Sequence, residues 1–173
     1  MAHWYMLTVV GADRPGIVAR ISQCLYQAGC NLGEASMIRL GGNFTIMLMI
    51  QTTQPRQQVE QALQPVAQEL GLSLHLDPIE GHLHEHRQPD VRITVFGADR
   101  SGIVAQVSNA LAGAGLDILE LESSVAGSRQ QPLYIMQLEG VASRGIEALR
   151  QALAEQLPQD IDVRIEPIDT LVG

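Results

Sequence analysis

Two short polar segments, residues 13–16 and 99–102, lie where an apolar stretch passes into a helical pattern. They read Asp-Arg-Pro-Gly and Asp-Arg-Ser-Gly. The first N–H groups of a helix have no partner within the helix, so they can hydrogen-bond a carboxylate. Gly16 and Gly102 let the backbone approach such a group closely, because glycine carries no side chain. The chemistry that this pattern favours is the binding of a small anion.

Asn31 and Asp117 form the second polar feature, because each follows the glycine that ends a helical pattern. Amide and carboxylate oxygens accept hydrogen bonds from an ammonium group, and the charged Asp117 would be the stronger partner. Together with the helix N-termini, these acceptors would match both charges of a free amino acid. Polar residues are also common after a helix-ending glycine for local reasons, so this interpretation has a structural alternative.

The charged residues of the two segments also have ordinary structural roles. Asp13 and Asp99 can stabilise a turn or cap a helix. Arg14 and Arg100 can remain solvated or pair with a nearby acid. Both alternatives stay open at the level of sequence.

Motifs for catalysis are absent from the sequence, including Gly-x-Ser-x-Gly, a P-loop and His-Glu-x-x-His. The sequence therefore predicts a protein that is not an enzyme and has no cofactor. His82, His84 and His86 alternate in a polar segment and could hold a divalent ion weakly. No cluster of carboxylates or cysteines accompanies them, so we expect no physiological metal site.

The chain repeats itself over half its length. Residues 9–19 and 95–105 agree at nine of eleven positions at an offset of 86. A period this close to half of 173 residues indicates duplication of a whole small domain, because solenoid repeats are shorter.

Each half has the pattern of strand, helix, two strands, helix and strand. We expect strands at about 5–10, 31–40, 43–51 and 73–76, with helices near 17–28 and 59–70. The second half predicts strands at about 91–96, 117–126, 133–139 and 161–165, with helices near 103–114 and 146–157. This order predicts an α+β chain of two ferredoxin-like βαββαβ domains, each with two helices on one face of a four-stranded antiparallel sheet. The expected domains are 1–78 and 90–173, joined by a linker at 79–89.

Several local features refine this scheme. Gly41-Gly42 predicts a tight hairpin turn, whereas Gly127–Pro132 predicts a longer polar loop. Pro65 falls inside a helical pattern, where we expect a kink or a break. The methionines on the strands are interpreted as core residues rather than as an interaction surface; these are Met6, Met37, Met47, Met49 and Met136.

The βαββαβ pattern resembles the ACT domain family of small-molecule sensors, most of which bind amino acids. The resemblance rests on Asp-Arg-Pro-Gly-Ile-Val at the first strand-to-helix turn, its second copy, and Asn-Leu at the second strand. It implies that domains pair along sheet or helix edges, within or between chains, and that an effector lies beside the first loop. Carried onto this chain, the candidate ligand-binding residues are Asp13, Arg14, Pro15, Gly16, Ile17, Asn31, Leu32, Asp99, Arg100, Ser101, Gly102, Ile103, Asp117 and Ile118. Ser101 departs from the proline that is usual at its position, so the two loops need not bind equally.

A free-standing tandem of such domains resembles the family of glycine cleavage system transcriptional repressors. That resemblance implies a cytoplasmic transcriptional regulator that senses a small amino acid, with glycine favoured, and acts through a partner protein. A regulatory subunit of an amino-acid biosynthetic enzyme is one alternative, and an enzyme without a recognisable catalytic motif is another. The resemblance leaves open whether several copies of the chain associate.

Composition and charge fit a soluble protein. Residues 1–10 are interpreted as a strand rather than a signal peptide, and no apolar run approaches the roughly 20 residues of a membrane helix. Cys24 and Cys30 are the two cysteines, and their spacing suggests neither a disulfide framework nor a zinc site. Free thiols suit a reducing compartment, so we expect a cytoplasmic location and no membrane partner.

The net charge of -8, without a run of lysines and arginines, predicts that the chain does not bind nucleic acid directly. We expect the fluorescence anisotropy of a labelled DNA duplex to stay unchanged when the protein is added at micromolar concentration in physiological salt. A basic DNA-binding domain of similar size serves as the positive control. Saturable binding by this chain would contradict the prediction.

Overall fold

The structure is a computed structural model that describes residues 1–80, 87–98, 102–128 and 131–168. The chain divides into two units, residues 1–84 and 85–173. The first contains β1 (His3–Ala12), α1 (Ile17–Gln27), β2 (Asn31–Leu40), β3 (Asn43–Thr52), α2 (Arg56–Leu70) and β4 (Ser73–Ile79). The second contains β5 (Val91–Ala98), α3 (Ile103–Gly113), β6 (Leu116–Ser128), β7 (Gln131–Ala142), α4 (Ile146–Gln156) and β8 (Asp162–Pro167).

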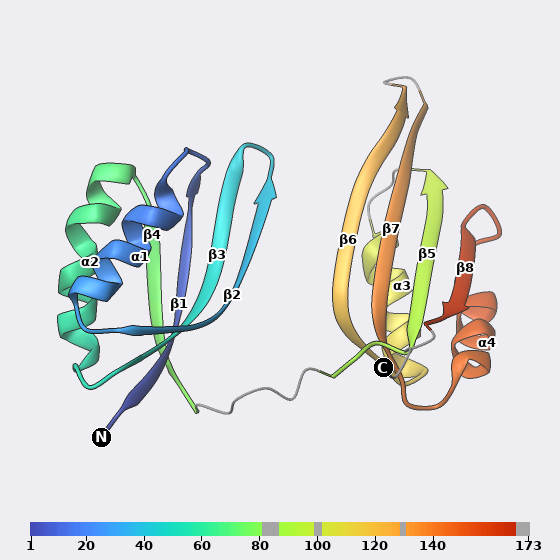
Figure 1. The fold of residues 1–173 in the computed structure, drawn as a ribbon. Coiled ribbons are helices and arrows are strands. Elements are labelled where there is room, and N and C mark those ends of the chain that lie inside the picture. Colours follow the sequence, from blue (N-terminus) through green and yellow to red (C-terminus); the bar gives the residue numbers. More distant parts are fainter. Residues whose placement is uncertain (81–86, 99–101, 129–130, 169–173) are drawn as a thin grey trace. The chain divides into compact units, whose positions relative to one another are not determined.

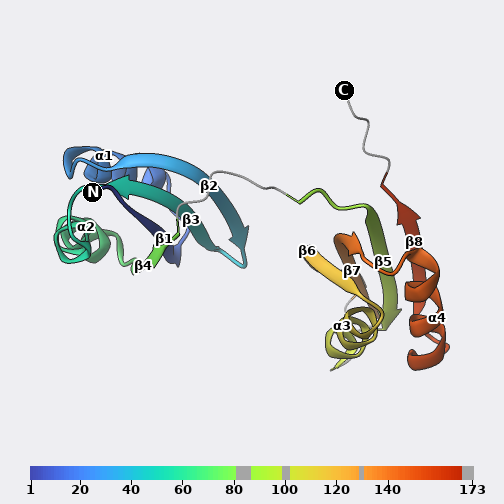
Figure 2. The ribbon, with the colours of Figure 1, turned by 90° about the horizontal axis from the view of Figure 1, so that it is seen from below.

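Each unit is a four-stranded antiparallel sheet with two helices on one face. The strand orders are β2-β3-β1-β4 and β6-β7-β5-β8, so β2 and β6 are edge strands. Figure 1 shows α1 and α2 on the same side of the first sheet, and Figure 2 shows α3 and α4 on one side of the second. The α+β fold with two ferredoxin-like domains is confirmed.

Alternation along the strands explains why one face is covered. In β1, Leu7 and Val9 are fully buried, whereas Val10 is 45% exposed. The helices meet this face with apolar stripes, and α1 buries Ile21 and Leu25 at helical spacing. Each unit has its own core of buried aliphatic residues, so each has the apolar interior that a domain requires.

Glycines fix the two turns that flank the second strand. Gly29 has φ +71° after α1, its N–H donates to the carbonyl of Tyr26, and the N–H of Cys30 donates to that of Leu25. These two bonds define a Schellman motif. Gly41 and Gly42, with φ of +59° and +77°, form the tight hairpin turn expected between β2 and β3.

Both edge strands carry a β-bulge at the same place in the repeat. One extra residue of β2 lies between Leu32 and Ala35, and one extra residue of β6 lies between Ile118 and Glu120. A bulge interrupts the regular ladder and bends the strand locally. Beyond it, β2 pairs with β3 without interruption from Ala35 to Leu40.

Two local features differ from expectation. A kink or a break is expected at Pro65, and helix α2 continues through that residue without a break. Pro65 is exposed, and the carbonyl of Gln61, which loses its helical donor, can be hydrated there. The loop at Gly127–Pro132 is also shorter than expected, because strand pairing extends to Ser128 and Gln131.

The methionines do not all lie in the core. Met136 is fully buried, but Met37 and Met47 are 45% and 48% exposed. Met47 points away from the helices because it alternates with the buried Ile46 and Leu48. The helices leave one sheet face and the β2 edge uncovered, and apolar residues remain there.

We predict that Pro65→Ala stabilises the first unit. Alanine restores the N–H that the helix lacks and has the best helix propensity, so the expected gain is about 1–3 kcal/mol. Urea unfolding followed by circular dichroism measures this change. Pro55→Ala is the matched control, because Pro55 lies at the N-cap of the same helix, where its missing N–H has no intrahelical acceptor. Equal effects of the two substitutions would contradict the prediction.

Candidate functional site

The loop between β1 and α1 presents a helix N-terminus to solvent. Gly16 caps α1 with φ +86°, and no side chain caps the helix. The next residue, Ile17, is 3% exposed and anchors the first turn in the core. A Cβ added to Gly16 would meet no atom within 4 Å, so the space beside the backbone is open. The first N–H groups of α1 thus have no side-chain cap and are candidate donors to a small anion.

Asp13 connects this loop to the β2–β3 hairpin. Its carboxylate Oδ2 lies 3.2 Å from Nε of Arg39, and its backbone N–H donates to the carbonyl of Gly42 at 3.0 Å. Asp13 does not cap α1, so the structure favours the ion pair over the helix cap. Arg14 and Pro15 are exposed on the same loop.

Asn31 and Leu32 are both exposed at the start of β2, but they lie at the opposite end of the sheet from the loop. Asn31 pairs with Gln51 of β3, and Gln51 pairs with Trp4 near the start of β1. The first loop follows Ala12, at the other end of β1. Eight residues of strand separate these levels, or about 27 Å at 3.4 Å per residue. One domain therefore does not bring Asn31 to its own first loop.

The second unit repeats this arrangement. Gly102 caps α3 with φ +89°, and Ile103 is 2% exposed. Asp99, Arg100 and Ser101 lie outside the described residues. Ile118 packs partly buried against the second core.

Asp117 begins the exposed part of β6 and already has a cationic partner. Its carboxylate forms an ion pair with the guanidinium of Arg87, and both side chains are more than half exposed. Asp117 aligns with Val141, one step beyond the pair of Val91 and Gly140, so it lies at the end of the sheet where β5 begins. As in the first unit, this is the end opposite the first loop.

Sequence reasoning missed Arg39 and Arg87 as partners of the two candidate carboxylates. Their separations from Asp13 and Asp117 are 26 and 30 residues. Only the strand register and the path of the chain into β5 bring these pairs together. No local motif marks such a pair, because the contact depends on tertiary structure.

The two thiols show no sign of a nucleophile. Burial raises the pKa of both Cys24 and Cys30 above the ordinary value of a thiol. The Cys24 thiol lies 3.0 Å from the carbonyl of Ala62, to which it can donate. A buried thiol with a raised pKa is mostly protonated at neutral pH, whereas the thiolate is the reactive form.

Comparison with known sequences identifies the class of protein. The ACT domain profile matches residues 3–77 and 90–166, which is most of both units. The chain belongs to the ACT domain family. It carries two ACT domains in tandem, as the repeat predicts.

The chain is also similar to individual curated proteins. The glycine cleavage system transcriptional repressor of Escherichia coli (strain K12) is 38% identical over 48 residues, which cover 28% of this chain and 25% of that protein. The match thus spans about a quarter of the curated relative. UPF0237 protein YjhC of Lactococcus lactis subsp. lactis (strain IL1403) is 35% identical over 72 residues, 41% of this chain and 83% of that protein.

Similarity to solved structures extends over nearly the whole chain in at least one case. One such structure is that of a proposed glycine cleavage system transcriptional repressor, with 22% identity and a TM-score of 0.73, covering 98% of this chain and 99% of that one. At this identity the likeness establishes the shared fold. The chain is a tandem ACT-domain protein related in sequence to a glycine cleavage system transcriptional repressor.

Within the described ranges, no group of three or more His, Cys, Asp and Glu residues is placed to hold a metal ion. The histidines at 82, 84 and 86 lie outside those ranges. Among the helices of the described residues, none is long and apolar enough to cross a membrane.

We predict that Gly16→Ala and Gly102→Ala each destabilise their own domain by about 1 kcal/mol. The cost comes from the positive φ, since the added Cβ meets no neighbour at either position. Thermal and urea unfolding measure the loss. Gly113→Ala is the control, because Gly113 ends α3, has no positive φ and also has open space around it. Destabilisation of the Gly113 variant to the same degree would contradict the assignment of the cost to backbone conformation.

Proposed function

We propose that this chain is an amino-acid-sensing transcriptional regulator of glycine cleavage that acts through a partner protein. The observation that carries the proposal is the exposed helix N-terminus at Gly16, repeated at Gly102, in a tandem ACT-domain protein. The sequence similarity to a glycine cleavage system transcriptional repressor supports the choice of pathway. Glycine is the favoured effector, because a small zwitterion needs little more than one anion site and one ammonium acceptor.

The site we propose is completed by a second ACT domain. Within one domain, Asn31 lies at the far end of the sheet from the first loop, so it cannot face the same ligand. Antiparallel pairing of β2 with β2 of a second copy would reverse the second strand. That arrangement would bring Asn31 of the second copy toward the loop that begins at Asp13. The wholly exposed edge of β2 supports this proposal.

In the second unit, the ammonium of the effector would compete with Arg87 for Asp117. Both side chains of that pair are more than half exposed, and exposed pairs contribute only about 0–1 kcal/mol. Exchange of one cation for another at Asp117 therefore has a small energetic cost. Weak binding suffices when an effector is abundant, because millimolar affinity corresponds to about -4 kcal/mol.

Regulation would pass to a protein partner rather than to DNA. The net charge of -8 opposes contact with phosphates. A coupling free energy of about 1–3 kcal/mol between effector and partner is enough to regulate binding. The two free thiols fit a cytoplasmic location.

A regulatory subunit of an amino-acid biosynthetic enzyme remains the alternative, because the ACT domain occurs in sensors of many kinds. Affinity purification of the tagged full chain, with and without glycine, separates the two functions. The proposal requires a transcription regulator as the co-purifying protein. A biosynthetic enzyme as the principal partner would favour the alternative.

We predict that Asn31→Ala and Asp117→Ala each weaken glycine binding, and that the double variant weakens it most. Alanine removes the ammonium acceptor without demanding a special backbone conformation. Loss of a charge-assisted hydrogen bond corresponds to roughly a tenfold change or more in affinity. Calorimetric titration of glycine, alanine and serine into the full chain measures this effect.

Asp162→Ala is the control for lost charge, because Asp162 is an exposed acid that begins β8, on the opposite sheet edge from Asp117. It should bind glycine as the wild type does. Binding that survives in the double variant would place the site elsewhere, and absence of binding by any small amino acid would reject the sensing function.

A further inference from the structure

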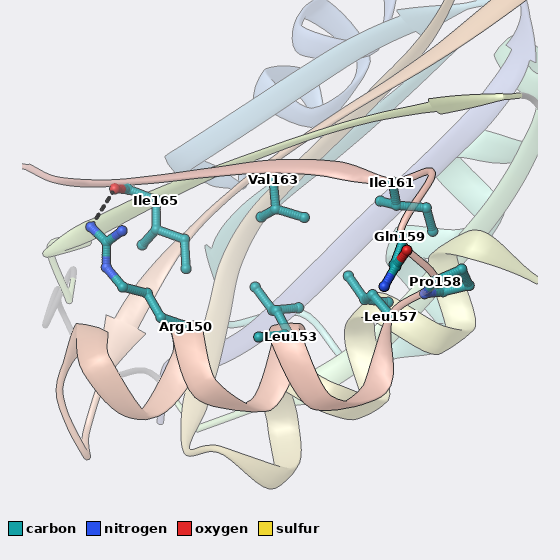
Figure 3. A pocket seen from close by; sticks show the side chains of 9 residues that line it. Arg150, Leu153, Leu157, Pro158, Gln159, Ile161, Val163 and Ile165 are labelled. Atoms are coloured by element: carbon teal, nitrogen blue, oxygen red, sulfur yellow. Dashed lines mark hydrogen bonds between the residues drawn. The ribbon is translucent and has the colours of Figure 1, made fainter.

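The two domains differ in the groove between the second helix and the last strand. In the second unit, a cavity of about 340 Å³ lies between α4 and β8. Its walls are mostly apolar, and Figure 3 shows one charged side chain at one end. The residues that define it are Arg150, Leu153, Leu157, Ile161, Val163 and Ile165.

The first unit has a smaller cavity at the equivalent place. Leu74 and Leu76 of β4 align with Val9 and Leu7, just as Val163 and Ile165 of β8 align with Val95 and Ile93. The cavity between α2 and β4 is lined by Leu74, Leu76 and Leu63 and measures about 150 Å³. The groove of the second unit thus has more than twice the volume.

The length of the helix accounts for this difference. α2 has 15 residues and ends at a glycine, whereas α4 has 11. Leu157 leaves the helix with φ -94° and ψ +145°, the extended conformation favoured before a proline such as Pro158. The chain then crosses to β8 through a loop where the first domain has a last helical turn. That missing turn opens one end of the groove.

The charge in the groove is also reversed between the domains. Glu60 follows the buried Val59 in α2, and Arg150 follows the buried Leu149 in α4, so the two occupy equivalent helical positions. Glu60 is paired with Arg56 at 2.7 Å. The wider groove therefore carries a guanidinium where the narrower one carries a carboxylate.

A hydrogen bond holds the Arg150 side chain in place, and its guanidinium still has N–H donors available for a ligand. Its Nη2 donates to the carbonyl of Ile165 at 3.2 Å, the dashed contact in Figure 3. Its Nε lies 3.8 Å from Oε2 of Glu147, whose side chain is 92% exposed. A guanidinium has five N–H donors, so the hydrogen bond to Ile165 leaves others for a ligand. The side chain is 52% exposed and can be reached from solvent.

We infer that this groove binds a small monocarboxylate with a short branched apolar tail. One guanidinium matches one carboxylate in charge and in paired geometry. The apolar walls between Leu153 and Val163 would receive the tail. The volume is at the lower end of the roughly 300–1,000 Å³ range of ligand pockets, which suits a tail of a few carbons. The inference does not depend on the first-loop site.

The test uses 4-methylpentanoate as the probe and the full chain as the protein. Calorimetry should give a dissociation constant of about 1 mM or tighter. Acetate lacks the tail and 4-methylpentan-1-ol lacks the charge, so each should bind at least about tenfold more weakly. Saturating glycine should not displace the probe, which separates this site from the proposed effector site.

Two variants locate the site. Arg150→Gln should weaken binding of the probe by about tenfold or more and leave binding of the alcohol unchanged. Ala154→Phe, at an exposed wall position, should block both. The control is Arg164→Gln, because the Arg164 guanidinium lies 5.3 Å from the Phe96 ring rather than in the groove. Thermal unfolding checks that each variant is folded.

The inference would be overturned by absence of saturable probe binding up to about 20 mM, by equal binding to wild type and Arg150→Gln, or by binding that survives Ala154→Phe. Displacement of the probe by glycine would move the carboxylate site to the first loop, which also contradicts the inference.

Discussion

Burial of a single sheet face by two helices is the interaction on which both domains depend. Leu7 and Val9 of β1 meet Ile21 and Leu25 of α1, and this packing fixes the helix across the strands. The chain must therefore reverse direction within the four residues between Ala12 and Ile17. Gly16 makes that reversal with a positive φ and leaves the helix N-terminus exposed. The candidate anion site is a direct result of the packing, because the helix must begin at the end of the sheet.

The same packing decides which surfaces stay open. Two helices are too narrow to cover four strands, so β2 is exposed along its whole length. Apolar residues of β2, including Leu32 and Met37, are exposed because of this geometry and not because the sequence pattern of the strand is weak. The ion pair between Asp13 and Arg39 then ties the first loop to the free strand. A ligand or partner at this edge would act on the loop and the strand together.

Sequence alone predicted the domain duplication, the order of elements and the strand and helix positions to within a few residues. Those features depend on local periodicity and on glycines such as Gly29 that end a helix. It did not predict the partners of Asp13 and Asp117, because strand register and tertiary contacts create them. It allowed for a break at Pro65 that does not occur, because a proline on the solvent face of a helix costs a hydrogen bond but need not end the helix. It could not show that Asn31 lies at the opposite end of the sheet from the first loop of its own domain, because strand register cannot be read from sequence spacing.

The bulge shared by β2 and β6 limits how these free edges can associate. A strand that pairs with β2 can stay in uninterrupted register from Ala35 to Leu40 only, because the extra residue after Leu32 shifts the ladder. Six residues are enough for two copies to meet about a two-fold axis, which uses the same edge of both. Such a pair is closed at this edge and presents no further β2 strand to a third copy. The bulge therefore shortens the run of β2 that another strand can pair with, and so reduces the aggregation hazard of a long exposed edge.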